Sequence, residues 1–180
     1  HFKGKDVTGV AVQKRNAAMV YQQFINYPNL SVFENIASPL RIARVADSEI
    51  KARVAKVASL LKLENMLQRS PQELSGGQQQ RVAIARAIAK RHDVLLCDEP
   101  TGALDSETGR AVLHVINDVN RELGATVMVV THAAATAQMA HRVIHFADGN
   151  IASVTTNDTR IEPRDIVWGA DACPRQKTPA

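Results

Sequence analysis

Cysteine and aromatic residues are scarce in this 180-residue chain. Its two cysteines, Cys97 in an apolar segment and Cys173 in a polar stretch, argue against a disulfide framework and favour a reducing, cytosolic setting. Aromatic residues make up 4% of the sequence, so the core must be built mainly from valine, isoleucine, leucine and alanine.

Long apolar runs and blocks of like charge are also missing. No apolar segment approaches the ~20 residues that a membrane-spanning helix needs, and no signal peptide opens the sequence. Lysine and arginine outnumber aspartate and glutamate by only 22 to 18, and the two signs are interspersed, so we expect no nucleic-acid partner. The chain begins with His1 rather than methionine, and we therefore expect it to start within a longer natural sequence.

Strand and helix patterns alternate along much of the chain. The expected strands are 18–21, 94–97, 126–130, 143–146 and 151–154, and the expected helices outside the middle of the chain are 106–123 and 134–140. Asp148-Gly149-Asn150 predicts a hairpin turn between the last two strands. Apolar strands that alternate with helices predict an α/β fold with a mostly parallel sheet covered by helices on both faces.

Residues 32–91 carry a helical pattern only. The recurrence of Ile50, Val54 and Val57 at helical spacing is typical of this stretch. We interpret it as a helical subdomain inserted into the α/β core. One domain is expected at 1–156, followed by a polar, loosely ordered tail at 157–180.

The residues Leu-Ser-Gly-Gly-Gln at 74–78 run directly into a predicted helix. A turn at a helix start exposes backbone N–H groups at the positive end of the helix dipole, which suits a phosphate group. Taken alone, a glycine pair at this position fits an ordinary turn equally well.

The apolar strand at 94–97 leads into Asp98 and Glu99. A buried strand of this kind delivers both carboxylates to the edge of the sheet where α/β proteins bind ligands. One carboxylate can hold Mg²⁺ through water, and the other can orient an attacking water. An acidic pair at a strand end is common in isolation, but together with residues 74–78 it indicates nucleotide hydrolysis.

Five motifs follow one another in order: Gln22 after a strand, residues 74–78, Asp98-Glu99, Ala-Leu-Asp at 103–105, and His132 after a strand. In this order they resemble the ATP-binding cassette (ABC) ATPases, from the start of the chain to about residue 155. The resemblance implies a P-loop NTPase-like sheet core.

The resemblance also implies a role for each motif residue. Glu99 would polarise water for attack on the γ-phosphate, and His132 would hydrogen-bond that phosphate and its developing charge. Gln22 is similar to the Q-loop glutamine, which touches Mg²⁺ or the attacking water and lies where the ATPase docks on its membrane subunit. The other correspondences are Ser75, Gly76, Gly77 and Gln78 with the signature, Asp98 with the metal-holding Walker B aspartate, and Asp105 with the D-loop aspartate.

The cofactors and partners follow from the same resemblance. ATP and Mg²⁺ are expected as cofactors. In this family the signature closes over ATP bound to the opposite subunit, which implies a second ATPase subunit, either identical or related. A transmembrane permease subunit is the other expected partner, with the chain peripheral on the cytoplasmic face of the membrane.

A Walker A phosphate loop, Gly-x-x-x-x-Gly-Lys-Ser/Thr, is missing. In the family it lies roughly forty residues before the Q-loop glutamine, whereas twenty-one residues precede Gln22 here. The pair Gly4-Lys5 is followed by Asp6, which lacks the hydroxyl that would ligate Mg²⁺. We expect an N-terminally truncated cassette that is inactive alone and of reduced stability. If the absence is genuine, the chain is a degenerate, non-catalytic partner subunit.

The subfamily indications conflict. Residues 19–40 are similar to importers of sugars and polyols, whereas residues 98–132 are similar to the lipoprotein-release and macrolide-export group. We favour a sugar-type importer because the loop after Gln22 is the part that meets the membrane subunit. A soluble ABC ATPase of DNA repair or translation is disfavoured because the sequence contains neither long coiled-coil heptads nor a second cassette.

Overall fold

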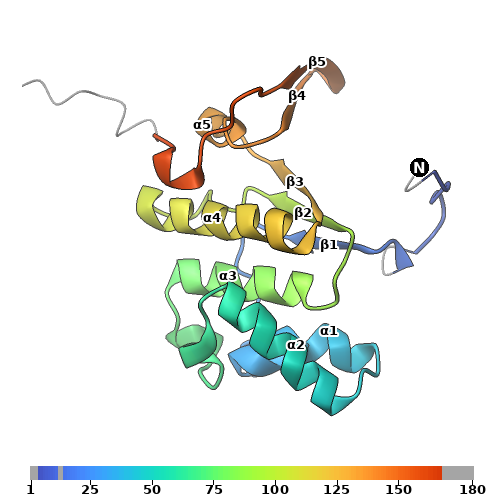
Figure 1. The fold of residues 1–180 in the computed structure, drawn as a ribbon, viewed down its shortest axis with the longest axis vertical. Helices are drawn as coiled ribbons and strands as arrows, with labels where there is room; N and C mark the ends of the chain where they lie inside the picture. The colour runs from blue at the N-terminus through green and yellow to red at the C-terminus, as the bar shows by residue number, and fades with distance from the viewer. Residues whose placement is uncertain (1–3, 12–13, 168–180) are drawn as a thin grey trace, which may run out of the picture. The chain divides into compact units, whose positions relative to one another are not determined.

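The computed structural model describes residues 4–11 and 14–167. The chain forms two compact units that divide between Val130 and Thr131 (Figure 1). The first unit contains β1 (Ala17–Val20), α1 (Val32–Ile42), α2 (Asp47–Leu60), α3 (Gly76–Ile88), β2 (Val94–Asp98), α4 (Ser106–Leu123) and β3 (Thr126–Val130). The second contains α5 (Ala134–Ala137), β4 (Arg142–Ala147) and β5 (Asn150–Thr156).

The sheet of the first unit has three parallel strands in the order β1-β2-β3. Its register places Met19 beside Leu96 and Leu96 beside Met128. A parallel pair needs a long crossover connection, and α1, α2 and α3 form the connection between β1 and β2. The predicted α/β fold with a parallel sheet and an inserted helical segment is confirmed.

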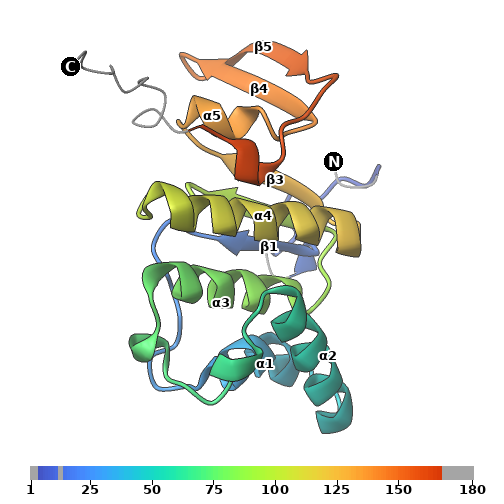
Figure 2. The same cartoon turned by 60° about the vertical axis from the view of Figure 1, so that its left-hand side comes forward.

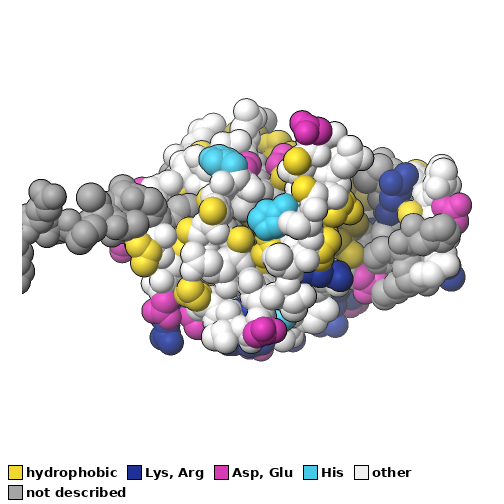
Figure 3. All heavy atoms as spheres, turned by 90° about the horizontal axis from the view of Figure 1, so that it is seen from above, with side chains coloured by type: hydrophobic (Ala, Val, Ile, Leu, Met, Phe, Trp, Pro, Cys, Tyr) yellow, Lys and Arg dark blue, Asp and Glu magenta, His cyan; other side chains and the backbone are white. Residues whose placement is uncertain are grey.

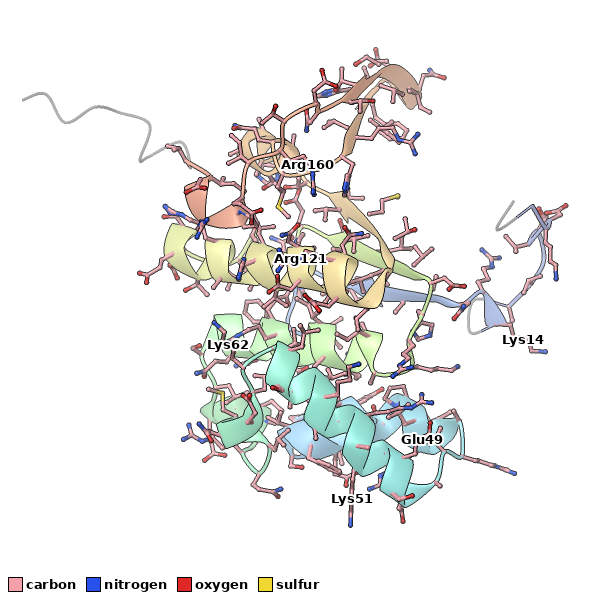
Figure 4. All side chains as sticks on the ribbon, viewed as in Figure 1. Lys14, Glu49, Lys51, Lys62, Arg121 and Arg160 are labelled. Carbon is pink, nitrogen blue, oxygen red and sulfur yellow. The ribbon has the colours of Figure 1, made fainter. Side chains whose placement is uncertain are left out.

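The helical segment packs as a bundle on the side of α3 away from the sheet (Figure 2). Its largest fully buried side chains include Ile36 and Leu40 of α1, Ile50 of α2 and Ile84 of α3. Charged residues of α2 face outward, among them Glu49 and Lys51 (Figure 4). This division between apolar and charged faces is the pattern of an amphipathic helix packed on a core.

Helix α4 begins and ends at residues that suit helix termini. The Asp105 carboxylate accepts a hydrogen bond from the Thr108 N–H at its start. Gly124 closes its end with a φ of 65°, in the left-handed region that glycine adopts without steric cost. The predicted helix 106–123 with a glycine stop is thus confirmed.

One face of the sheet is buried and the other is open. Leu95 and Cys97 are 2% and 1% exposed, whereas Met19, Met128 and Val130, which alternate to the opposite face, are 43%, 52% and 54% exposed. Helix α3 contacts β1, α4 contacts β3, and the two helices contact each other, so they cover the same face. The expectation that helices cover both faces is therefore wrong for the described residues.

The open face makes a testable prediction about surface behaviour. Met128→Gln should reduce the binding of an apolar fluorescent dye, because it removes half-exposed apolar surface from this face. The free energy of unfolding should change by no more than about 0.5 kcal/mol. Thr126→Gln, on the same strand and face, is the matched control and should leave dye binding unchanged. An equal effect of both substitutions would contradict the prediction.

The second unit is built on an antiparallel hairpin. Strands β4 and β5 are joined by a turn in which Asp148 and Gly149 have φ of 49° and 76°, which confirms the predicted turn. The hairpin exposes apolar side chains, with Phe146 at 68% and Ile151 at 59%. Hydrophobic side chains reach the surface at several places in Figure 3.

The segment after β5 ends the described part of the chain. Ile166 follows a short 3₁₀ turn at Pro163–Asp165 and is 2% exposed. Trp168 and Cys173, both in the predicted tail, lie outside the described residues.

Candidate functional site

The site is assembled at the carboxyl end of the parallel sheet. Gln22 lies two residues beyond β1, while Asp98 ends β2 and Glu99 follows it. A Cβ built on Gly102 would lie 2.8 Å from the Gln22 amide nitrogen and 3.5 Å from the Glu99 Cβ. Gln22 and Glu99 therefore both lie close to the bare backbone of Gly102, where an added side chain would collide with Gln22.

The backbone of Glu99 adopts an unusual conformation. Its φ is 44°, in the left-handed region that side-chain-bearing residues rarely occupy. The Glu99 N–H donates to the Val130 carbonyl over 2.8 Å, and its own carbonyl accepts from the Gly102 N–H over 3.0 Å. Such a conformation costs on the order of 1–3 kcal/mol and is characteristic of functional sites. The two hydrogen bonds hold Glu99 in it at the end of β2.

The signature residues form the start of α3. Ser75 is the residue that caps the helix, its hydroxyl accepting from the Gln78 N–H over 3.4 Å, while Gln78 Oε1 accepts from the Ser75 N–H over 2.9 Å. This reciprocal pair is a capping box. Helix geometry leaves the N–H groups of Gly76 and Gly77 without partners inside the helix. The arrangement suits an anion, as the sequence predicts.

The two signature glycines also have a packing role that sequence reasoning missed. A Cβ on Gly77 would lie 2.1 Å from Thr108 Cγ2 of α4, and a Cβ on Gly76 would lie 3.1 Å from the Phe24 ring and 3.5 Å from Leu104 Cδ2. The glycines therefore allow α3 to approach α4 and the loops after β1 and β2. No pattern in the sequence separates this role from the predicted contact with phosphate.

Asp105 has a local structural role in this state. Its carboxylate accepts the Thr108 N–H over 3.0 Å, and hydrogen bonds with Thr108 hold the pKa of Asp105 below its usual value. Its contact with nucleotide stays a prediction.

The lowered pKa of Asp105 predicts a pH-dependent contribution to stability. The contribution is present above the pKa of the unfolded chain and is lost as the pH falls through the lower pKa of the folded chain. Asp105→Asn should therefore lower the urea midpoint at about pH 7, and the difference from wild type should shrink at about pH 3. Asp118→Asn, a carboxylate within α4 rather than at its start, is the comparison variant. A difference for Asp105→Asn that persists at low pH would contradict the assignment.

His132 lies two residues beyond β3, in the second unit, and its side chain is exposed. Its predicted role as the switch histidine stays a prediction. Cys97, in contrast, is fully buried in β2, and burial raises the pKa of its thiol to about 12. It is therefore a small core residue without reactive character.

Magnesium fits the ligands that this end of the sheet offers. Asp98 supplies a carboxylate and Gln22 an amide oxygen, the oxygen ligands that Mg²⁺ prefers. Within residues 4–11 and 14–167 no cluster of three or more histidine, cysteine, aspartate or glutamate side chains could hold a metal alone. A Mg²⁺ ion at Asp98 would thus depend on phosphate oxygens and water for its remaining ligands, as is usual at nucleotide sites.

A cavity also lies away from these residues. It has a volume of about 360 Å³ and opens at the amino end of β2, where Asp93 and Val94 line it together with Lys56, Arg91 and Glu122. Its lining mixes charges of both signs and contains none of the predicted site residues. We therefore assign the site to the carboxyl end of the strands on its chemistry rather than on cavity size.

Sequence reasoning overlooked Gln80, a fully buried polar residue of α3. Its side chain donates to the carbonyls of Tyr21 and Pro100, which adjoin Gln22 and Glu99. The signal was available, because Gln80 occupies the same buried helix stripe as Ile84 and Ile88, at intervals of four residues.

Comparisons with known proteins identify the family of the chain. A sequence model of the family described as ABC transporter matches residues 1–102. The chain is 40% identical over 150 residues to a spermidine/putrescine import ATP-binding protein, PotA, of Aggregatibacter actinomycetemcomitans, covering 83% of this chain and 40% of that protein. It is 42% identical over 153 residues to a methionine import ATP-binding protein, MetN, of Bradyrhizobium diazoefficiens, covering 82% and 44%. The chain thus spans less than half the length of these relatives.

Solved structures of ABC transporter cassettes also match the chain. The dimeric structure of MJ0796, a bacterial ABC transporter cassette, matches with a TM-score of 0.68 and 37% identity, covering 80% of this chain and 65% of that one. A dimeric post-hydrolysis state of MJ0796 bound to ADP and Pi matches with a TM-score of 0.67 and 36% identity. Because the family model matches more than half of the sequence and the fold is that of a cassette, the chain belongs to the ABC transporter family.

Proposed function

We propose that this chain is part of the ATP-hydrolysing subunit of an ABC importer. The observation that carries the proposal is the meeting of Gln22 and Glu99 around Gly102 at the carboxyl end of the sheet, one residue from Asp98. The family match and the relatives named as import ATP-binding proteins support it.

In this proposal each residue acts on a defined part of MgATP. Glu99 accepts a hydrogen bond from the attacking water and orients it toward the γ-phosphate, while Gln22 lies beside it. Asp98 would hold Mg²⁺, which when bound would neutralise charge on the phosphates. His132 donates a hydrogen bond to the γ-phosphate oxygens. The helix start at Ser75 faces ATP that a second subunit holds, so hydrolysis requires a dimer.

The loop after Gln22 is the proposed contact with a transmembrane permease on the cytoplasmic face of the membrane. In this loop Ile25 and Tyr27 are both 48% exposed, and Tyr21, directly before Gln22, is 47% exposed. Arg86 of α3 steadies the loop: its guanidinium donates to the Ile25 carbonyl over 2.5 Å and lies 4.9 Å from the centre of the Tyr27 ring. Exposed apolar and aromatic side chains on a loop that is fixed by hydrogen bonds are suited to contact with a protein partner. In the part of the chain that the structure describes, no helix is long and apolar enough to span the membrane itself.

The relatives bear on the transported substrate. Their names refer to spermidine/putrescine and methionine import, not to sugars, and not to the release of lipoproteins or macrolides. We therefore propose import of a small organic solute and do not carry the sugar-type specificity forward.

A degenerate, non-catalytic partner subunit is the second candidate, because the 180 residues contain no phosphate loop. The DNA upstream of the codon for His1 separates the two. An in-frame Gly-x-x-x-x-Gly-Lys-Ser/Thr sequence supports the ATPase, whereas a start codon near residue 1 with no such sequence supports the degenerate subunit.

If that motif is present, the longer product provides the activity test. It should hydrolyse ATP, and Glu99→Gln should lower kcat by at least about 10²-fold with little change in KM, because it removes a group that acts on the attacking water. Asp118→Asn, remote from the site on α4, is the control. A Glu99→Gln product with an unchanged kcat would refute the proposed mechanism.

A further inference from the structure

Gln80 connects the two strand ends that carry the site. It lies on α3 with 0% of its surface exposed. Its amide nitrogen donates to the Pro100 carbonyl over 3.0 Å and to the Tyr21 carbonyl over 3.3 Å. Tyr21 precedes Gln22 and Pro100 follows Glu99 in the chain, so one side chain holds the backbone beside both site residues.

The chemistry of this position requires an amide. A primary amide nitrogen carries two hydrogens, and here each has a carbonyl acceptor. A glutamate would place an acceptor against two carbonyl oxygens, and a methionine would leave both carbonyls without a donor. Among the described residues, Gln80 Oε1 is buried and has no hydrogen-bond partner. The two N–H donors of the amide, and not its oxygen, therefore make the contacts of this side chain.

The linkage matters because the two strand ends lie so close together. Gln22 packs against the bare Cα of Gly102, and Glu99 holds a left-handed backbone conformation. A displacement of either loop would change the separation between the Gln22 amide and the Glu99 carboxylate. Misplacement of reacting groups by about 1 Å can cost about 10²-fold in rate.

We propose that Gln80 is a positioning residue: by donating to Tyr21 and Pro100 it fixes the spacing of Gln22 and Glu99. The inference rests on the proposed function in one respect, namely that Gln22 and Glu99 act on bound nucleotide. Gln80 touches neither nucleotide nor metal in this scheme and acts through the two loops.

Amide hydrogen exchange of the 180-residue chain, followed by NMR, tests the linkage without nucleotide. Gln80→Met keeps the side-chain length and removes both donors. Exchange should accelerate about tenfold at the amides of Ile25, Glu99 and Gly102, relative to amides in the middle of α4, because two hydrogen bonds are lost locally. The chemical shifts of Gln22 and Glu99 should move together. These three amides are suitable reporters because each donates a hydrogen bond within its own loop or to β3.

Gln79→Met is the matched control, since its amide donates only to the Leu74 carbonyl, over 3.1 Å, at the start of the same helix. It should leave the reporter amides unchanged. If Gln80→Met does not fold, Gln80→Asn replaces it; its shorter stem cannot reach both carbonyls, so one loop should lose protection. Equal exchange in all variants, or an acceleration spread evenly over the chain, would overturn the proposal. A longer product that contains the phosphate loop and still fails to bind MgATP would count against the proposed function alone.

Discussion

Gly77→Ala is expected to lower the free energy of unfolding by about 2 kcal/mol. The new Cβ would lie 2.1 Å from Thr108 Cγ2, so α3 and α4 would have to move apart in a packed region. Alanine favours helix over glycine by up to about 1 kcal/mol, and the clash outweighs that gain. Urea denaturation of the purified variant measures the loss.

The rescue variant makes this prediction specific. Thr108→Ser removes the methyl group that the Gly77→Ala Cβ would strike, and it retains the hydroxyl. The double variant should recover most of the lost stability. Gly76→Ala is the matched control at the neighbouring position, where the nearest atom is the Phe24 ring at 3.1 Å, and its cost should stay below about 1 kcal/mol. If the double variant is no more stable than Gly77→Ala, the contact between α3 and α4 is not the cause.

The purified 180-residue chain is expected to bind ATP weakly and not to turn it over. The phosphate-loop backbone and lysine supply most contacts to the β- and γ-phosphates in this class of protein, and the sequence contains no such loop. We expect a Kd of about 1 mM or weaker, and a turnover at least about 10³-fold below the roughly 10 s⁻¹ typical of enzymes. Equilibrium binding and phosphate release measure the two quantities.

Glu99→Gln of the same chain is the control for turnover. Because we expect no catalysis by the chain alone, the variant and the wild type should release phosphate at the same background rate. A wild-type rate well above that of Glu99→Gln, or a submicromolar Kd for ATP, would show that the chain holds ATP without the missing loop.

Much of the candidate site could be predicted from the sequence, because its residues follow strands that a simple pattern identifies. The apolar segments 18–21 and 94–97 predict parallel strands, and parallel strands end at one edge of a sheet. The proximity of Gln22 and Glu99 follows from that topology. The motif order supplied the family, which the comparisons confirm.

Other features depended on distances that a sequence pattern does not contain. The contact of Gly77 with Thr108 joins residues of two helices, and the bonds of Gln80 join one helix to two loops. The prediction that helices cover both faces of the sheet was wrong for a related reason. A strand pattern shows that Met19 and Met128 are apolar, but it does not show whether a helix lies above them.

The most direct test of the site maps weak MgATP binding onto the ¹⁵N-labelled chain by NMR titration. If the carboxyl end of the sheet is the nucleotide site, the shift changes should cluster at Gln22, Asp98 and Glu99. Changes confined to the cavity around Arg91 at the opposite edge of the sheet would contradict it.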